Sequence, residues 1–474
     1  MKKDSTPANA ERRAIPASNL AVTILLVVLL AAVLGVVVGF GTMGVLGIAD
    51  LLQEHIWEKF FFDASGPLHM VAPLILCLIG GVAIGLWTRK CGYTLDTMGE
   101  VIADYKRDGG YRVPNWGESL ILFILPIAFG GAVGPEAGIS GFAAAGLSGL
   151  SNSVRRAGRG ALSKPKHPVT AAFTALLASS DDSTATADAS ATTGGSTANT
   201  ASKDAKDPTD PTTSAQTSSS GGHESKISET YDIPHPRLLR TIVWAIAGLG
   251  FAGGCALVVR ILGHFAAIAR FDTLDFSSLS GTSIAVAVLA LFVGWACAAM
   301  GDLFNAWSKK LMAHVGPDPL PRAIICGIAL GAVACFMPGV LFSGQTGTED
   351  MMHEWTSWAP IMLVLLVVLK LFLTKLCVAA DWVGGEFFPT IFCGVCLGYA
   401  LALWFGVDPI LVVCVTTASL VSAWTRKPLL ATAVLALCFP PLDLIIVLAA
   451  AYLVSALQTL THKVTVRLTR KQTA

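Results

Sequence analysis

One acidic residue stands alone within a long uncharged stretch of this chain. Glu136 directly follows Pro135, and no other Asp, Glu, Lys or Arg lies between Leu120 and Val154. An ionisable side chain inside an apolar stretch is costly to bury in a membrane and is therefore a candidate for function. Its carboxylate could occupy an anion site as a tethered competitor and leave the site on protonation. The alternative is a glutamate that only complements the dipole of a helix start.

The sequence around Glu136 recurs in the second half of the chain. Residues 130–141 read GGAVGPEAGISG and residues 384–394 read GGEFFPTIFCG, so each has a Gly-Gly pair, three residues and then a proline. Pro135 and Pro389 favour helix starts, where the first N–H groups lack partners and carry about half a positive charge. Two helix starts aimed at one point would bind an anion through backbone amides. The candidate amides are those of Gly134, Ala137, Gly138, Glu386, Phe387 and Phe388.

Backbone amides suit an ion pathway better than a lysine or an arginine would. A full cationic charge would hold a permeating anion too tightly to release it. Similar helix starts in corresponding places of two halves also indicate an internal repeat, and inverted repeats in transporters meet near the membrane midplane. We therefore expect an all-α, polytopic membrane protein of two inverted repeats, with full-length and broken helices.

The composition favours membrane helices as the elements that position these residues. Of the 474 residues, 53% are hydrophobic and 14% charged, with a net charge of +1, whereas a soluble protein has about 25% charged residues. These values disfavour a soluble enzyme, and there is no global field to attract nucleic acid. A spanning helix needs about 20 apolar residues. The full-length candidates are 20–49, 68–88, 237–263, 283–301, 320–341, 357–380 and 438–461.

Shorter apolar pieces lie between these candidates and are interrupted by glycine and proline. They are 118–131, 135–150, 167–179, 387–405, 409–424 and 427–437. Pieces of this length are too short to cross alone. Interrupted helices at membrane depth are tolerated where they are buried in protein or line a polar cavity, and in transporters they mark the ion site.

A polar segment divides the chain into two parts. Residues 181–220 contain no Leu, Ile, Val, Phe, Met, Trp, Tyr or Cys, so they cannot bury enough apolar surface to fold. Basic residues near both ends of the chain predict that both termini are cytoplasmic, in a multi-pass protein of the plasma membrane. The predicted organisation is a cytoplasmic tail (1–19), a first membrane repeat (20–180), a disordered linker (181–232), a second membrane repeat (233–461) and a cytoplasmic tail (462–474).

The order of these motifs resembles the CLC family of chloride channels and transporters. Residues 134–138 (GPEAG) resemble the family's gating-glutamate motif, and residues 385–389 (GEFFP) resemble its GxFxP motif. In the second half, residues 336–344 are similar to a Pro/Gly break of the family, and residues 418–429 to its short helix pair. The resemblance, closest to bacterial members with a GPE motif, implies passage of chloride or a similar anion, gated by Glu136. It also implies a homodimer with one pore per subunit. Because the sequence has no P-loop, dinucleotide fingerprint or metal-ligand cluster, we expect no cofactor.

The chain also departs from the family pattern. The motif that supplies a serine to the central anion falls near residues 92–96 (GYTLD), where Thr94 is the candidate replacement. Pro135 replaces a basic residue and removes one backbone N–H, and Glu386 stands where the family has an apolar residue. Residues 453–474 lack the expected tyrosine. These departures leave open whether the anion is chloride, fluoride or another ion, and whether protons are exchanged for it.

A protease of the rhomboid type is the alternative from a different class. Residues 138–141 (GISG) match its GxSG motif, but that chemistry needs a histidine to activate Ser140, and His264 is the best candidate. Small residues for helix packing explain Ser140 better, and a protease would leave Glu136 without a role.

Two lysines and two cysteines in apolar segments complete the set of candidates. Lys370 and Lys375 could snorkel, pair with a carboxylate such as Asp381, or attract anions. Cys393 and Cys396 have the spacing of a metal or redox pair, but no second pair accompanies them. We therefore interpret the cysteines as apolar helix residues and expect neither a metal nor enzyme activity.

Overall fold

The computed structural model describes residues 17–57, 67–108, 110–162, 236–262 and 270–472, and these residues form helices joined by loops. No strand occurs in these residues apart from one isolated β-bridge, which confirms the all-α prediction. Seven helices of the described part are long and apolar enough to cross a membrane. They are α1 (Ala17–Trp57), α2 (Pro67–Cys91), α8 (Pro236–Leu262), α9 (Gly281–Val315), α12 (Pro360–Ala379), α13 (Phe387–Phe405) and α16 (Leu444–Gln472).

Three of the remaining helices of the described residues start at side chains that cap helices well. Asn115, Asp318 and Asp408 each accept a hydrogen bond from the backbone N–H two residues further on, as N-cap side chains do. The α-helices are α3 (Met98–Asp108), α4 (Trp116–Ala128), α5 (Glu136–Leu162), α10 (Pro319–Ala334), α11 (Gln345–Glu354), α14 (Pro409–Thr425) and α15 (Pro428–Leu435). Three 3-10 turns accompany them, η2 (Phe276–Ser278), η3 (Pro338–Val340) and η4 (Trp355–Ser357).

Two of the predicted spans are wrong in length. The segment 320–341 is not a full-length helix, because α10 ends at Ala334 and the chain then turns through η3. The segment 387–405 is not a broken piece but the continuous 19-residue helix α13. Its glycines stay helical because they admit a neighbour: a Cβ at Gly394 would lie 2.7 Å from the Cα of Thr417 on α14.

The described residues divide into two compact units. One comprises residues up to Phe40 together with Gly146–Ala256, and the other comprises Gly41–Ala145 and Leu257–Ala474. The predicted linker 181–232 and the piece 167–179 lie outside the described residues, so the predicted division into repeats stays a prediction.

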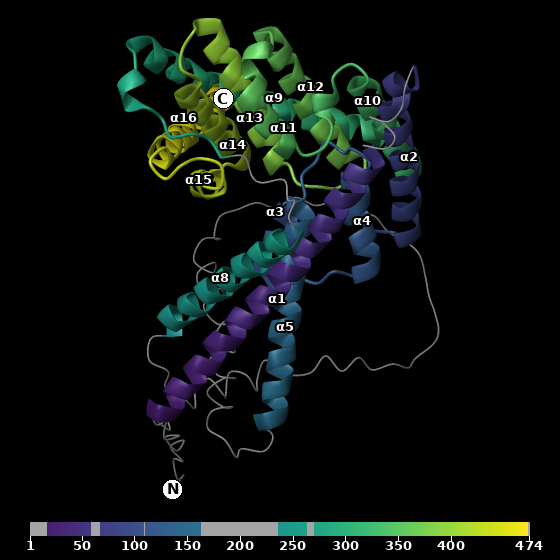
Figure 1. The fold of residues 1–474 in the computed structure, drawn as a ribbon, viewed down its shortest axis with the longest axis vertical. Helices are drawn as coiled ribbons and strands as arrows, with labels where there is room; N and C mark the ends of the chain where they lie inside the picture. The colour runs from purple at the N-terminus through teal and green to yellow at the C-terminus, as the bar shows by residue number, and fades with distance from the viewer. Residues whose placement is uncertain (1–16, 58–66, 109, 163–235, 263–269, 473–474) are drawn as a thin grey trace. The chain divides into compact units, whose positions relative to one another are not determined.

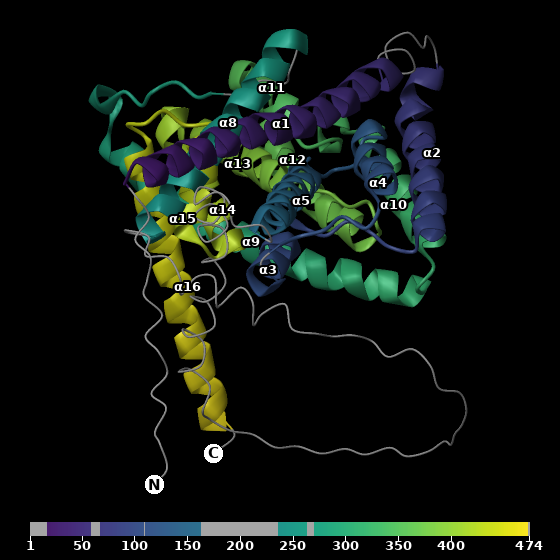
Figure 2. The same cartoon turned by 90° about the horizontal axis from the view of Figure 1, so that it is seen from below.

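Glycines bring helices into close contact in each unit. In the larger unit α2 lies beside α10 (Figures 1 and 2), and a Cβ at Gly327 would clash with the carbonyl of Cys77. In the smaller unit α1 and α8 cross in the same way, since a Cβ at Gly35 would clash with the carbonyl of Ala247. Such contacts are typical of helices that associate in membranes, where small residues allow close packing.

Candidate anion site at two paired helix starts

The two Gly-Gly repeats of the sequence lie against each other in the larger unit. The Gly134 N–H donates to the Gly385 carbonyl over 2.7 Å, and the Gly385 N–H donates to the Gly134 carbonyl over 2.6 Å. This antiparallel bridge joins the two segments immediately before α5 and α13. The helix starts that the repeat predicts therefore meet at one place.

Neighbouring side chains fix the loop that leads into α5. The Thr374 hydroxyl on α12 donates to the Ala132 carbonyl over 2.8 Å. The fully buried Trp382 packs against Gly131, where a Cβ would lie 3.1 Å from the indole ring. Its indole N–H donates to the Ala323 carbonyl on α10. The loop is thus held by side chains from the second half of the chain.

Both prolines lie at the helix starts, with small shifts from the predicted first position. Pro135 precedes Glu136, the first residue of α5, whereas Pro389 is the third residue of α13. The first turn of α13 is closed at Glu386, whose carbonyl accepts from the N–H and the hydroxyl of Thr390 at 3.1 and 2.6 Å. Shifts of one or two residues are within the ordinary variation of helix boundaries.

The Glu136 carboxylate lies across the gap between the two helix starts. Its Oε1 accepts a hydrogen bond of 2.6 Å from the Phe388 N–H in the first turn of α13. Its Oε2 is buried and has no hydrogen-bond partner among the described residues. A Cβ on Gly134 or on Gly385 would overlap the carboxylate, so the bare backbone of these two glycines makes the space that it fills.

A second acidic side chain lies at the start of α13 and is paired with a cation. Glu386 Oε2 is 2.7 Å from the ammonium of Lys375, and their side chains are 18% and 8% exposed. The Lys375 ammonium is also 5.4 Å from the centroid of the Trp424 ring. The prediction that Lys375 pairs with a carboxylate is right in kind but wrong in the partner suggested, since Asp381 pairs with Arg322 at 3.3 Å.

Lys370 makes a different set of contacts one turn earlier on α12. Its side chain is fully buried, and its ammonium donates to the carbonyls of Val340, Leu341 and Phe342 at 2.9, 2.7 and 2.7 Å. These carbonyls belong to the last residue of η3 and the two residues after it, where the helical hydrogen bonding stops. Lys370 therefore supplies donors that the break in the backbone would otherwise lack.

The other predicted amide donors lie in the first turn of α5. Ala137 and Gly138 are buried, and they line a small cavity together with Leu95, Asp96 and Tyr111. Thr94, the predicted serine replacement, is exposed and does not line this cavity. Asp96, two residues further on, does.

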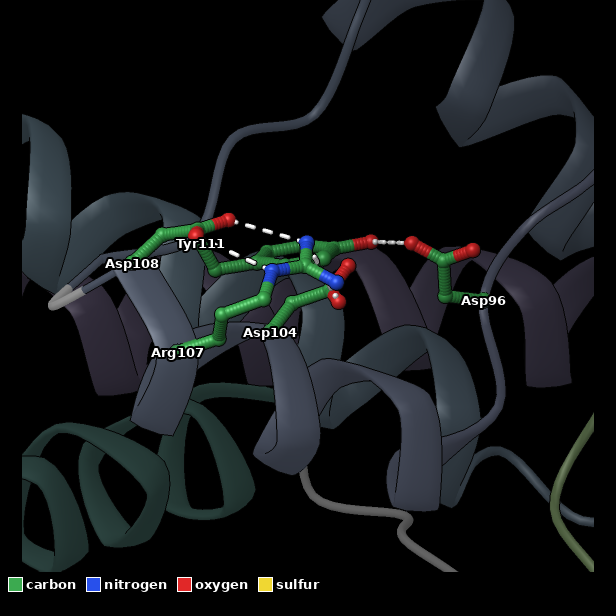
Figure 3. Close-up of polar contacts among 5 residues, drawn as sticks. All are labelled: Asp96, Asp104, Arg107, Asp108 and Tyr111. Atoms are coloured by element: carbon green, nitrogen blue, oxygen red, sulfur yellow. Dashed lines mark hydrogen bonds and ion pairs between the residues drawn. The ribbon is translucent and has the colours of Figure 1, made fainter. Parts of the chain in front are cut away.

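The sequence analysis missed Asp96 and Tyr111. The Tyr111 hydroxyl donates to Asp96 Oδ2 over 2.8 Å (Figure 3). A local signal was available, because Thr97 and Glu100 form a capping box that starts α3 directly after Asp96: the Thr97 N–H donates to Glu100 Oε2 over 2.8 Å. Asp96 comes just before the start of α3 and lines the same cavity as the first turn of α5. The reasoning that singled out Glu136, a carboxylate at a helix start, therefore applies to Asp96 as well.

The far end of α3 carries a solvated group of charges. Arg107 lies 3.0 Å from both Asp104 and Asp108 (Figure 3). The hydrogen bond from Arg107 lowers the pKa of Asp108 below its usual value. Exposed pairs of this kind contribute little to stability, so these residues form a surface of α3 and not part of the site.

The remaining candidates from the sequence make structural contacts. The Ser140 hydroxyl donates to the Ala137 carbonyl of its own helix over 2.8 Å, and His264 lies outside the described residues. Cys393 and Cys396 are buried free thiols. In the part of the chain that the structure describes, no group of three His, Cys, Asp or Glu is arranged to hold a metal ion.

Part of the chain is similar to known chloride channel proteins. The family model "Voltage gated chloride channel" matches residues 230–459. A chloride channel protein CLC-f of Arabidopsis thaliana is 29% identical over 123 residues, which is 23% of this chain and 15% of the relative. A putative chloride channel protein ClcB-like of Ralstonia nicotianae is 27% identical over 184 residues, or 37% of this chain and 41% of the relative. The matches thus span less than half of these curated relatives.

Solved structures extend the likeness to nearly the whole chain. A CLC-type fluoride/proton antiporter has a TM-score of 0.56 at 18% identity, covering 93% of this chain and 97% of the other. A slow cyanobacterial Cl⁻/H⁺ antiporter has a TM-score of 0.52 at 14% identity, with coverage of 90% and 94%. At these identities the likeness shows the fold. Together with the apolar helices, it indicates a multi-pass membrane protein with a fold similar to that of CLC transporters, and residues 230–459 match the family model of voltage gated chloride channels.

Proposed function

We propose that this chain moves a small monovalent anion across the membrane, with chloride as the first candidate and fluoride as the second, and that Glu136 gates the pathway. One observation carries the proposal: the Glu136 carboxylate accepts the Phe388 N–H at the start of α13. An unpaired N–H at a helix start attracts negative charge. The side chain thus holds the place that a permeating anion would take.

The gating step follows from the charge of this carboxylate. When it is ionised, it competes with the anion for the Phe388 N–H and for the helix start. When it is protonated, the competition ends and the anion can enter. The candidate amides for the anion are those of Gly134, Ala137, Gly138, Glu386, Phe387 and Phe388, and Pro135 lacks an N–H, which makes the first helix start the weaker one.

Proton-coupled exchange is the second candidate. Exchange is favoured by the second carboxylate oxygen of Glu136, Oε2, which is buried without a hydrogen-bond partner among the described residues. This oxygen could receive a proton. Both solved structures described above are named antiporters that exchange protons for fluoride or chloride. A channel needs protonation of Glu136 only as a gate, whereas an exchanger must carry that proton across.

The test measures anion efflux from liposomes that contain the purified protein, with the external pH recorded at the same time. Chloride and fluoride gradients are compared with a potassium gradient. Uphill proton movement driven by an anion gradient indicates exchange, and anion flux without a pH change indicates a channel. Potassium flux without anion flux would refute the proposal.

Glu136→Gln tests the gate in the same assay. Glutamine has nearly the size of glutamate but stays neutral, so the variant should resemble the protonated state. We expect wild-type flux to rise as the pH falls, and the flux of the variant to equal or exceed it at every pH. A helix-capping role alone predicts an unchanged pH profile and a stability loss of about 1 kcal/mol or less.

We also propose a homodimer in the plasma membrane with both termini cytoplasmic. Both ends of the chain are rich in basic residues, with Lys463, Arg467, Arg470 and Lys471 at the C-terminal end, and such residues favour the cytoplasmic side. Cross-linking in native membranes and protease access from each side test these two proposals.

A further inference from the structure

Lys375 and Glu386 form a buried ion pair directly beside the proposed anion site. Glu386 is the N-cap residue of α13, and the Phe388 N–H two residues further on holds the Glu136 carboxylate. The pair is close, at 2.7 Å, and the Lys375 residue is only 6% exposed. Taking two charges out of water is costly, and close geometry such as this is needed to offset that cost.

The carboxylate of Glu386 would oppose anion binding if it stood alone. With Glu136 it would place two negative charges at two helix starts whose N–H groups attract anions. The positive charge of Lys375 compensates the negative charge of Glu386. Glu386 in turn compensates the charge of Lys375, which would otherwise hold an anion too tightly to let it leave.

Two other cations near α12, the buried Lys370 and the half-buried Arg322, have other partners in the described structure. The Lys370 ammonium donates to three backbone carbonyls, and Arg322 pairs with Asp381. Lys375 is held over the face of Trp424, and Phe387 packs edge-on against the same ring at 4.8 Å. The Trp424 ring therefore contacts both the Lys375 ammonium and Phe387, the first residue of α13, and helps to fix the pair in place.

We propose that Lys375 and Glu386 set the anion affinity of the site as a balanced pair, with Lys375 raising it and Glu386 lowering it. The inference rests on the proposed anion transport and adds two residues that determine anion affinity to it. It also accounts for the acidic residue at a position where the family resemblance predicts an apolar one.

The proposal predicts opposite effects for the two single substitutions. Glu386→Gln keeps the size of the side chain but leaves the lysine charge uncompensated, so chloride or fluoride should bind about tenfold more tightly and turn over more slowly. Lys375→Met leaves the carboxylate uncompensated, so binding should weaken by about tenfold or more and flux should fall. The double variant should return to within about threefold of the wild-type affinity.

The measurement is anion affinity by titration calorimetry of the purified full-length protein with sodium chloride and sodium fluoride, followed by flux in liposomes. The matched control is Arg322→Met with Asp381→Asn, which removes an ion pair of the same kind from α10 and the end of α12. This control should leave the anion affinity unchanged. If Lys375→Met does not fold, Glu386→Gln shows whether Glu386 lowers the anion affinity. Comparison of Glu386→Gln with the double variant then shows whether Lys375 raises it.

Two results would overturn the inference. One is a loss of thermal stability in both single variants with unchanged anion affinity, which marks the pair as structural only. The other is a change of affinity in the same direction for both. A wild-type protein that neither binds nor carries anions would instead refute the proposed function, so the two failures are distinguishable.

Discussion

Replacing Gly385 by alanine should open the gate without touching the gating residue. A Cβ at this position would occupy the space of Glu136 Oε2 and would also lie 2.9 Å from the Glu136 Cβ. Gly385 is not among the residues with a positive φ, so alanine adds no backbone strain there. The added methyl group therefore acts mainly by pushing the carboxylate away from its site.

The size of the effect follows from the hydrogen bond that would be lost. The Phe388 N–H holds the carboxylate at 2.6 Å, and a shift of about 1 Å takes such a pair beyond hydrogen-bond distance. A hydrogen bond to a charged group is worth about 1.5–3 kcal/mol. At about 1.4 kcal/mol per factor of ten, the balance between blocked and open states should move by roughly 10- to 150-fold.

The assay is anion flux from liposomes between pH 4.5 and 8. Gly385→Ala should pass more anion than wild type at high pH, where Glu136 is ionised, and should depend less on pH. Combining it with Glu136→Ala should add nothing further, because each change already removes the carboxylate from the Phe388 N–H. Gly384→Ala is the control, since its Cβ would crowd Val133 at 2.5 Å instead of the carboxylate. A folded Gly385→Ala protein with the wild-type pH profile would refute this reasoning.

Three other predictions follow from the contacts described above. Lys370→Met should lower the free energy of unfolding by about 3 kcal/mol, because it leaves two buried carbonyls and one partly buried carbonyl without their donor. Denaturation in detergent measures this, with the exposed Lys309→Met as a control expected to change little. Tyr111→Phe should cost about 1–2 kcal/mol by removing the donor to Asp96, and a variant as stable as wild type in the same measurement would contradict it. Deleting residues 181–220 should leave expression and flux nearly unchanged, because the segment has no apolar side chain to anchor it; loss of either would show that the segment packs against the membrane helices.

The helical fold was predictable because its main signal is local. Apolar runs of sufficient length predict spanning helices wherever they occur. The two errors in length have opposite causes. The prediction for 320–341 ignored a break, since α10 ends at Ala334 and Pro338 starts η3. The prediction for 387–405 took the glycines as breaks, but in α13 they are contact points for α14. A glycine that breaks a helix and one that packs look the same in a sequence.

The candidate site was predictable only in part. The repeated Gly-Gly pairs pointed to Glu136 and to the helix starts, because a repeat is visible without any knowledge of contacts. The pairing of Lys375 with Glu386 was not, since a lysine in an apolar helix can pair with any carboxylate that folding brings to it. The three carbonyls around Lys370 belong to an irregular turn whose geometry has no sequence signature. Asp96 was missed because the predicted position, Thr94, was chosen by resemblance instead of by its distance from a helix start.

The bridge between the two Gly-Gly segments has a consequence for biosynthesis. Glu136 and the amide that holds it are 252 residues apart in the chain. Synthesis at about 5–20 residues per second separates the appearance of these two partners by roughly 13–50 s. During this interval the first helix start stands in the membrane with its amides and its carboxylate unmatched, which is unfavourable in an apolar environment. The first half of the chain should therefore depend on temporary shielding, by lipid headgroups, water or an insertion factor, until the second half arrives.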